Sequence, residues 1–271
     1  MKDSCLATSP AICFSLFRVR RAVATMVLCA ATILGTGTPN LEAASSIQPN
    51  QIPAELARKG KGLSALKAVM AVATSYDHGK SRQDVKGFLL YRRPSDFRFQ
   101  GLGPGGHPLF ELILKANTFE LYVPGDGKIL KGAKDCFNRR FPDVAELENL
   151  IPLALLQWKD AHFEEALSQD ARTTVIRVRM RQEMWKATLD SKDLHVLSLQ
   201  RLNEGKPDLL AHFGDFGSSD YGWLPRRFDI QSSRAGWRSL VTIQQLEANP
   251  FFVESNFKLE TLFSPQIEQC R

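Results

Sequence analysis

Motifs for metal binding and for covalent catalysis are missing from this sequence. Its 271 residues include five cysteines and five histidines, which form no CxxC pair, no His-rich cluster and no other metal-ligand spacing. The GxSxG turn that presents a serine nucleophile is absent as well. We therefore predict a protein that is not an enzyme, with no catalytic residue, no metal site and no cofactor.

A phosphate cradle and a nucleic-acid surface are also absent. Residues 101–106 (GLGPGG) are rich in glycine, but neither a Lys-Ser or Lys-Thr pair nor a helix signal follows them. Such a segment is typical of a hairpin connection. The formal net charge is +6, with the Lys and Arg residues scattered among acidic ones. We therefore expect no nucleic-acid partner.

Long apolar runs are scarce, and the most prominent one lies near the N-terminus. Residues 22–35 (AVATMVLCAATILG) are apolar and follow Arg18, Arg20 and Arg21. A basic segment, an apolar run of this length and small residues after it are typical of a secretory signal peptide. An uncleaved membrane anchor is the alternative, although the run is shorter than the ~20 apolar residues that span a bilayer.

This leader predicts where the mature protein begins. We expect a signal peptide over residues 1–44, with cleavage near Ala43 or Ala44. Residues 45–271 then form an exported domain, which we expect in the periplasm.

The cysteines are distributed as in an exported protein. Cys5, Cys13 and Cys29 lie in the leader and are lost with it. The other two, Cys136 and Cys270, are a candidate disulfide pair, because exported proteins fold in an oxidising compartment.

Apolar and polar residues alternate along most of the mature chain with the period of a strand. Leu66, Ala68 and Met70 share one face of the first such segment. The alternation recurs along the chain between turn signals such as PGDG at residues 124–127. The pattern predicts one α+β domain, mainly β, with a large curved antiparallel sheet of about eleven strands and helices on one side.

Two segments have helical spacing instead. Residues 52–63 (IPAELARKGKGL) have a proline and a glutamate where a first helical turn would place them. In residues 142–158 (PDVAELENLIPLALLQW), apolar residues including Leu147 and Leu150 recur every three or four positions. Pro152 is expected to kink or end this second helix.

Three short motifs carry a family resemblance. They are GFLLYRRPSDFRF (87–99), NTFELYVP (117–124) and YGWLPRRFDI (221–230). Together with the leader and the two helices, they resemble the LolA/LolB superfamily of bacterial lipoprotein carriers over residues 52–265. The resemblance implies an incomplete, half-open antiparallel β-barrel closed by helices, with an apolar cavity for acyl chains.

The resemblance also implies which residues face the cavity. In the strand that begins GFLLYRR, Leu89 and Tyr91 alternate with Phe88 and Leu90, so both faces of the strand are apolar. The resemblance explains this if one face lines the inner cavity and the other is buried by packing on the outside. The expected lining consists of aliphatic and aromatic residues and one arginine: Leu89, Tyr91, Arg93, Phe97, Phe99, Leu112, Leu114, Phe119, Leu121, Leu147, Leu150 and Ile151.

Two adjacent arginines end that strand and are expected to differ. Arg93 shares a face with Leu89 and Tyr91, so it points inward at the rim. By the resemblance it hydrogen-bonds the helices that close the barrel. Arg92 is expected to lie in water.

The resemblance implies a carrier protein that catalyses no reaction. We expect a periplasmic carrier that binds lipoprotein acyl chains or lipids and moves them towards the outer membrane. Its expected partners are an inner-membrane transporter as donor and an outer-membrane receptor. An envelope sensor or scaffold with the same fold is one alternative, and an uncharacterised exported hydrolase is another.

Overall fold

The computed structural model describes residues 47–180, 182–259 and 265–270. By its internal contacts the chain divides into two units, Met1–Ala43 and Ala44–Arg271. The expected leader and its cleavage site lie outside the described residues, so both stay predictions. The fold belongs to the second unit.

The first half of this unit contains one helix, a six-stranded meander and two further helices. Its elements are η1 (Pro49–Gln51), α1 (Ile52–Gly60), β1 (Ala65–Tyr76), η2 (Asp77–Gly79), β2 (Ser81–Arg92), β3 (Asp96–Leu102), η3 (Pro104–Gly106), β4 (Pro108–Leu114), β5 (Thr118–Val123), η4 (Pro124–Asp126), β6 (Lys128–Ala133), α2 (Lys134–Arg140) and α3 (Pro142–Ala154). Both predicted helices are thus present, and α3 continues two residues beyond Pro152.

The second half is almost entirely strand. Its elements are β7 (Ala161–Gln169), β8 (Thr173–Met180), β9 (Glu183–Asp190), β10 (Val196–Asn203), β11 (Lys206–Gly214), β12 (Gly217–Ser219), β13 (Gly222–Leu224), β14 (Arg227–Ser232), β15 (Trp237–Ala248), η5 (Glu254–Phe257) and β16 (Gln266–Cys270). No helix in the described part of the chain is long and apolar enough to cross a membrane.

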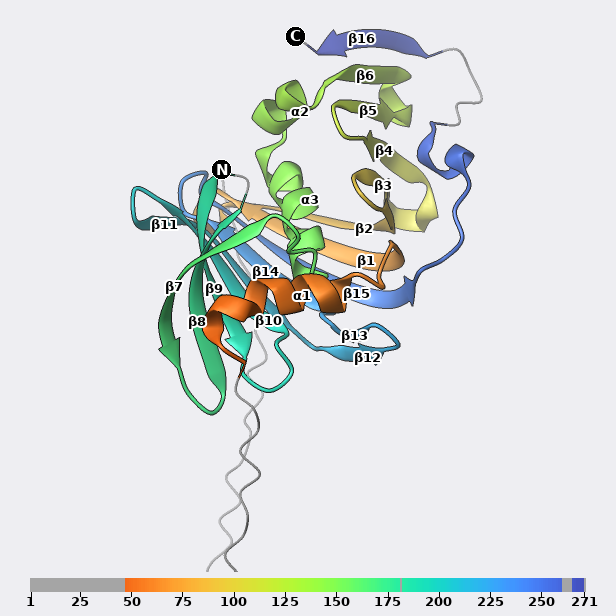
Figure 1. Ribbon diagram of the computed structural model, residues 1–271. Coiled ribbons are helices and arrows are strands. Elements are labelled where there is room, and N and C mark those ends of the chain that lie inside the picture. Colours follow the sequence, from red (N-terminus) through yellow and green to blue (C-terminus); the bar gives the residue numbers. More distant parts are fainter. Residues whose placement is uncertain (1–46, 181, 260–264, 271) are drawn as a thin grey trace, which may run out of the picture. The chain divides into compact units, whose positions relative to one another are not determined.

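One large sheet organises the unit, in the order β16-β6-β5-β4-β3-β2-β1-β15-β14-β11-β10-β9-β8-β7. It curls around the helices but is not closed into a barrel (Figure 1). This confirms the predicted mainly β fold of an incomplete barrel with helices on its concave side. One pairing differs from the all-antiparallel expectation, because β16 runs parallel to β6.

The described residues contain sixteen strands rather than the predicted eleven or so. Five strands were not predicted: β6, which has a single buried residue, and four strands with little or no buried face. The two edge strands, β7 and β16, are mostly exposed along their length. The strands β12 and β13 are only three residues each. Strands that bury no face carry no period-two signal.

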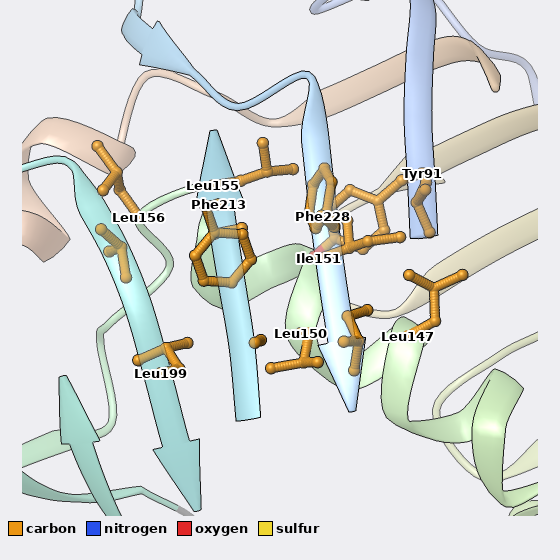
Figure 2. Packing of buried hydrophobic residues seen from close by; sticks show 14 of the residues in the cluster. Tyr91, Leu147, Leu150, Ile151, Leu155, Leu156, Leu199, Phe213 and Phe228 are labelled. Carbon is orange, nitrogen blue, oxygen red and sulfur yellow. The ribbon is translucent and has the colours of Figure 1, made fainter. Parts of the chain in front are cut away.

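The concave face of the sheet is packed against α1 and α3. Leu56 of α1 and Leu150 of α3 are both fully buried. Figure 2 shows Leu150 and Ile151 of α3 lying among Phe213 and Phe228 from the sheet. Burying an aliphatic side chain of this size contributes about 1.5–3 kcal/mol, so these contacts fix the helix on the sheet.

The convex face is less covered than predicted. Leu89 and Tyr91 of β2 are 1% and 2% exposed, whereas Phe88, which precedes Leu89 and points to the other face, is 41% exposed. The expectation that both faces of this strand are buried is therefore wrong at Phe88. The helices lie on the concave side (Figure 1), so the other side of the strand is left open here.

Candidate functional site: an apolar cavity under the helices

A cavity of about 360 Å³ lies between part of the sheet and the helices. Strands β1 to β5 and β15 form one wall, and α2, α3 and the residue between them form the other. Most of its lining is apolar: Val72, Val85, Phe97, Phe99, Leu109, Phe110, Leu112, Leu121, Val123, Phe137, Phe141, Val144 and Leu147.

The register of the strands explains this lining. Phe99 lies opposite both Leu89 on β2 and Leu112 on β4. Phe97 lies opposite Tyr91 in the same way. Directly paired residues of antiparallel strands share a face, so the two phenylalanines point to the concave side with Leu89 and Tyr91.

Two glycines leave room for the aromatic rings. Gly87 and Gly101 are directly paired on β2 and β3. A Cβ on Gly87 would lie 2.8 Å from the Phe99 ring, and one on Gly101 would lie 2.7 Å from Cζ of Phe110. The two rings meet edge to face, with centroids 5.7 Å apart. Side chains at the two glycines would push these rings into the cavity.

One end of the cavity is polar. Gln83, Thr74 and Ser239 lie directly opposite one another on β2, β1 and β15, and all three line the cavity. The Thr74 and Ser239 hydroxyls are 2.8 Å apart and both residues are buried. These side chains form a polar row across three strands, next to the apolar pair Val72 and Val85.

A tyrosine and an aspartate complete this end. Tyr76, two residues after Thr74, donates a hydrogen bond to Oδ2 of Asp143 at 2.7 Å. Burial, together with the neighbouring Asp143 carboxylate, raises the pKa of the Tyr76 phenol. Asp143 lies in the first turn of α3, where the helix dipole favours a negative charge. We call Thr74, Tyr76, Gln83, Asp143 and Ser239 the polar end.

The cavity opens towards the loop between β3 and β4. Val72, Val85 and Leu109 line both the cavity and a neighbouring surface groove of about 700 Å³. The far side of that groove includes the glycine-rich loop at residues 103–106. Leu109 is 42% exposed, so an apolar side chain stands at the mouth.

The structure places the twelve predicted cavity residues in four settings. Five of them line the cavity: Phe97, Phe99, Leu112, Leu121 and Leu147. Four more are buried without lining it: Tyr91, Leu114, Phe119 and Leu150. Leu89 and Ile151 line a separate void of only about 10 Å³, which cannot hold an acyl chain. The twelfth is Arg93.

Arg93 lies outside the cavity lining, at the end of α1. Its Nη2 donates a hydrogen bond to the carbonyl oxygen of Gly60 at 2.5 Å. The expected contact with a helix is thus present, although it is made to α1 rather than to α3. The peptide bond between Arg93 and Pro94 is cis.

Arg92 does not lie free in water as predicted. It makes ion pairs with Asp96 at 2.5 Å and with Glu254 at 2.8 Å, and its guanidinium lies 4.7 Å from the centre of the Phe257 ring. Arg92 therefore holds the segment after β15 against the sheet.

Helix α3, the expected lid, is tied down by polar contacts at three points. Tyr76 binds Asp143, Lys134 pairs with Glu148 at 2.9 Å, and Arg201 of β10 pairs with Glu146 at 2.6 Å. Burial raises the pKa of Glu146, against the opposing effect of Arg201. Three polar contacts therefore anchor this helix to β1, α2 and β10.

The two candidate cysteines are joined in the structure. Cys136 of α2 and Cys270 of β16 form a disulfide across a sequence separation of 134 residues. It links α2, whose Phe137 lines the cavity, to an edge strand of the sheet. The disulfide therefore supports the wall of the cavity rather than taking part in it.

One group of acidic residues and a histidine lies outside the cavity lining. Potential ligand atoms of Asp190, Asp193 and His195 lie within 4.8 Å of one another. Oδ1 of Asp190 already accepts hydrogen bonds from the backbone of Lys192 and Asp193. These bonds define the turn between β9 and β10.

The polar end was not predicted from the sequence. Thr74, Tyr76 and Ser239 lie on strands whose apolar alternation was recognised, but single hydroxyl residues at strand ends gave no signal of a shared site. Asp143 was recognised only as a residue that opens a helix. Their meeting depends on the pairing of β1 with β15, which joins residues 165 positions apart.

Comparison with known proteins supports the fold. No protein-family model matches the chain, and no curated protein matches its sequence. A DUF1329 family protein from Desulfovibrio piger has a TM-score of 0.59 and 9% identity, over 78% of this chain and 98% of the other. A domain from Vibrio parahaemolyticus, described as belonging to an outer membrane lipoprotein-sorting protein, has a TM-score of 0.56 and 13% identity, over 76% and 94%.

A third structure carries the superfamily name. The LolA superfamily protein from Nitrosomonas europaea has a TM-score of 0.54 and 8% identity, over 76% of this chain and 97% of the other. The chain therefore has a LolA-like fold, as its short motifs indicated. At such low identities the likeness concerns the fold alone.

Proposed function

We propose that this protein is a periplasmic carrier that binds acyl chains of lipids or lipoproteins in the cavity and moves them towards the outer membrane. The observation that carries the proposal is the cavity of about 360 Å³ with its aliphatic and aromatic lining. Apolar cavities of this size are typical of small-molecule sites. Two proteins of similar fold, named for lipoprotein sorting and for the LolA superfamily, support this reading.

The free energy expected for binding an acyl chain suits a carrier. Each methylene of an acyl chain contributes about 0.8 kcal/mol when it leaves water. A chain of about a dozen carbons would gain about 10 kcal/mol, from which the cost of association, about 4–15 kcal/mol, is subtracted. The net free energy of binding is then at most about 6 kcal/mol in favour of the complex, so a ligand held in this way can be released.

The lining supports binding rather than catalysis. Thr74 and Ser239 are its only described residues with an aliphatic hydroxyl, and their hydroxyls bond each other. The lining contains no histidine, lysine or cysteine that would activate them. Transfer would instead depend on α3 and on partners at the two membranes, an inner-membrane donor and an outer-membrane receptor.

The proposal is tested by filling the cavity. Leu121 of β5 lines it, whereas the next residue, Tyr122, does not. We expect Leu121→Trp to weaken binding of the neutral apolar fluorophore N-phenyl-1-naphthylamine by at least tenfold. The matched variant Tyr122→Trp should bind it as the unmodified protein does. Equal binding by both variants would contradict a ligand site in this cavity.

A further inference from the structure

The size of the cavity limits how many acyl chains it holds. A methylene group is about as large as a water molecule, which occupies about 30 Å³ in the liquid. A volume of about 360 Å³ therefore holds one chain of about a dozen carbons. Three chains, as on a triacylated lipoprotein, would need several times that volume. The neighbouring void at Leu89 and Ile151 adds only about 10 Å³. The groove of about 700 Å³ beyond the mouth is open at the surface and has Arg82, Asp84 and Lys86 in its lining, so it is less suited to burying further acyl chains.

The polar end limits the head group. Asp143 is the only charged residue among those that line the cavity in the described part of the chain. None of the described lining residues is basic, and the Asp143 carboxylate accepts a hydrogen bond from the neutral phenol of Tyr76. A carboxylate or phosphate group brought to this end would face a like charge with no lysine or arginine in the lining to offset it.

Two arginines lie close in sequence to residues of the polar end, and both contact other groups. Arg82, beside Gln83, pairs with Asp84 at 2.9 Å. The Arg140 guanidinium lies 5.9 Å from the centre of the Phe141 ring, and Arg140 does not line the cavity. Neither arginine is therefore part of the cavity lining that contains Asp143.

The polar end suits a head group that donates hydrogen bonds. The Asp143 carboxylate only accepts, while the hydroxyls of Thr74 and Ser239 can both donate and accept. From this end, the apolar lining continues through Val72 and Val85 to the rings of Phe99 and Phe110. The cavity is thus amphipathic along its length, like a fatty alcohol or a monoacylglycerol.

We propose that the ligand is a single-chain amphiphile whose head group donates hydrogen bonds and carries no negative charge. Its head group lies at the polar end, against Asp143, Thr74 and Ser239, and its chain lies against Phe99 and Phe110. This inference rests on the proposed function and narrows it to a class of lipid.

Three probes with matched chains test the inference on the purified full chain at pH 7.5. They are monolauroylglycerol, lauric acid, and a synthetic lipopeptide with three lauroyl chains, each measured by displacement of N-phenyl-1-naphthylamine below its micellar concentration. We expect monolauroylglycerol to bind at least tenfold more tightly than either of the others.

Variants then locate the head group. Asp143→Asn should improve lauric acid binding by about tenfold relative to monolauroylglycerol, because it removes the opposing charge. Asp135→Asn is the matched control, since Asp135 is an exposed residue in the first turn of α2 and does not line the cavity. Tyr76→Phe keeps the Asp143 charge, so this variant should still bind lauric acid more weakly than monolauroylglycerol. The Tyr76→Phe variant supplies the test if Asp143→Asn does not fold.

The outcomes separate this inference from the proposed function. If lauric acid or the lipopeptide binds as tightly as monolauroylglycerol, the inference is overturned and the carrier function stands. A Tyr76→Phe variant that favours lauric acid, or an Asp143→Asn variant that leaves the ratio unchanged, would also overturn it. If none of the three probes displaces the fluorophore, both proposals fail.

Discussion

Arg93 and Gly60 join the end of β2 to the end of α1, through a hydrogen bond of 2.5 Å from the guanidinium to the backbone carbonyl. Gly60 in turn lies so close to the backbone of Leu156 that no Cβ would fit there. Three parts of the chain therefore meet at this point: the first helix, the Arg-Pro turn after β2, and the segment that follows α3. Burial lowers the pKa of Arg93.

Removing this contact should loosen α1 without emptying the cavity. Arg93→Leu is expected to lower the free energy of unfolding by about 1–3 kcal/mol, the usual effect of losing a hydrogen bond to a charged group. Amide hydrogen exchange in α1 should accelerate, while fluorophore binding is retained. Arg58→Leu, in an exposed pair with Glu55 of the same helix, should have a much smaller effect, because solvent screens exposed ion pairs. Equal effects of the two variants would contradict the account of Arg93.

Arg201 should control how firmly α3 closes the cavity. It pairs with Glu146 of α3 and with Asp208 of β11, at 2.6 and 2.9 Å. Arg201→Met would leave these two largely buried carboxylates unpaired, and we expect it to lower the free energy of unfolding by about 3 kcal/mol. Hydrogen exchange in α3 should accelerate more than in β1 and β2.

A double variant separates anchoring from general damage. Adding Glu146→Gln to Arg201→Met removes one of the stranded charges, so part of the lost stability should return. If the double variant is no more stable than Arg201→Met alone, the Arg201–Glu146 pair does not hold the helix.

The sequence was sufficient for the first five strands of the meander and for α3, because these elements bury one face and so carry a periodic signal. It was sufficient also for the face on which Phe97, Phe99 and Leu112 lie. It could not show whether the space opposite that face is filled. Leu89 and Leu121 have the same periodic signal, but Leu89 is packed by α3 and the sheet, while Leu121 meets the cavity.

Contacts between segments that are distant in the sequence could not be predicted either. Arg92 is paired with Glu254, which lies 162 residues further along the chain, and local pattern gives no sign of that partner. The parallel pairing of β16 with β6 is similar, because β16 is exposed and lies at the sheet edge. Such contacts depend on the tertiary fold, which brings the two segments together, and not on the local sequence of either segment.

The pair between Arg92 and Glu254 makes the segment after β15 sensitive to acid. Hydrogen bonds from Arg92 and Lys115 lower the pKa of Glu254 from 4.5 to about 2. A lowered pKa in the folded state stabilises that state above pH 4.5, and this contribution is lost as the pH falls towards 2. An NMR titration of the Glu254 carboxyl carbon should therefore have its midpoint near pH 2.

Arg92→Gln should move that midpoint upwards, towards 4.5, because it removes the largest cause of the shift. Arg82→Gln is the control, since Arg82 pairs with Asp84 instead. A midpoint unaffected by Arg92→Gln would show that Glu254 is not held as described.

The disulfide should stabilise the edge of the sheet beside the cavity. It closes a loop of 134 residues, for which the chain-entropy model gives about 3–5 kcal/mol. We expect the double variant Cys136→Ser and Cys270→Ser to lose stability of this size in urea denaturation. Because β16 is exposed and, among the described strands, pairs with β6 alone, its amides should exchange well before those of β1. Unchanged protection of β16 would contradict this role.

The central claim is that the cavity carries an acyl chain in the cell. The most direct measurement is mass spectrometry of lipids extracted from the protein purified from the periplasm without detergent, with Leu121→Trp and Tyr122→Trp prepared in parallel. We predict a lipid in about equimolar amount with the unmodified protein and with Tyr122→Trp, and its loss from Leu121→Trp. The absence of bound lipid from the unmodified protein, or its retention by Leu121→Trp, would contradict the account.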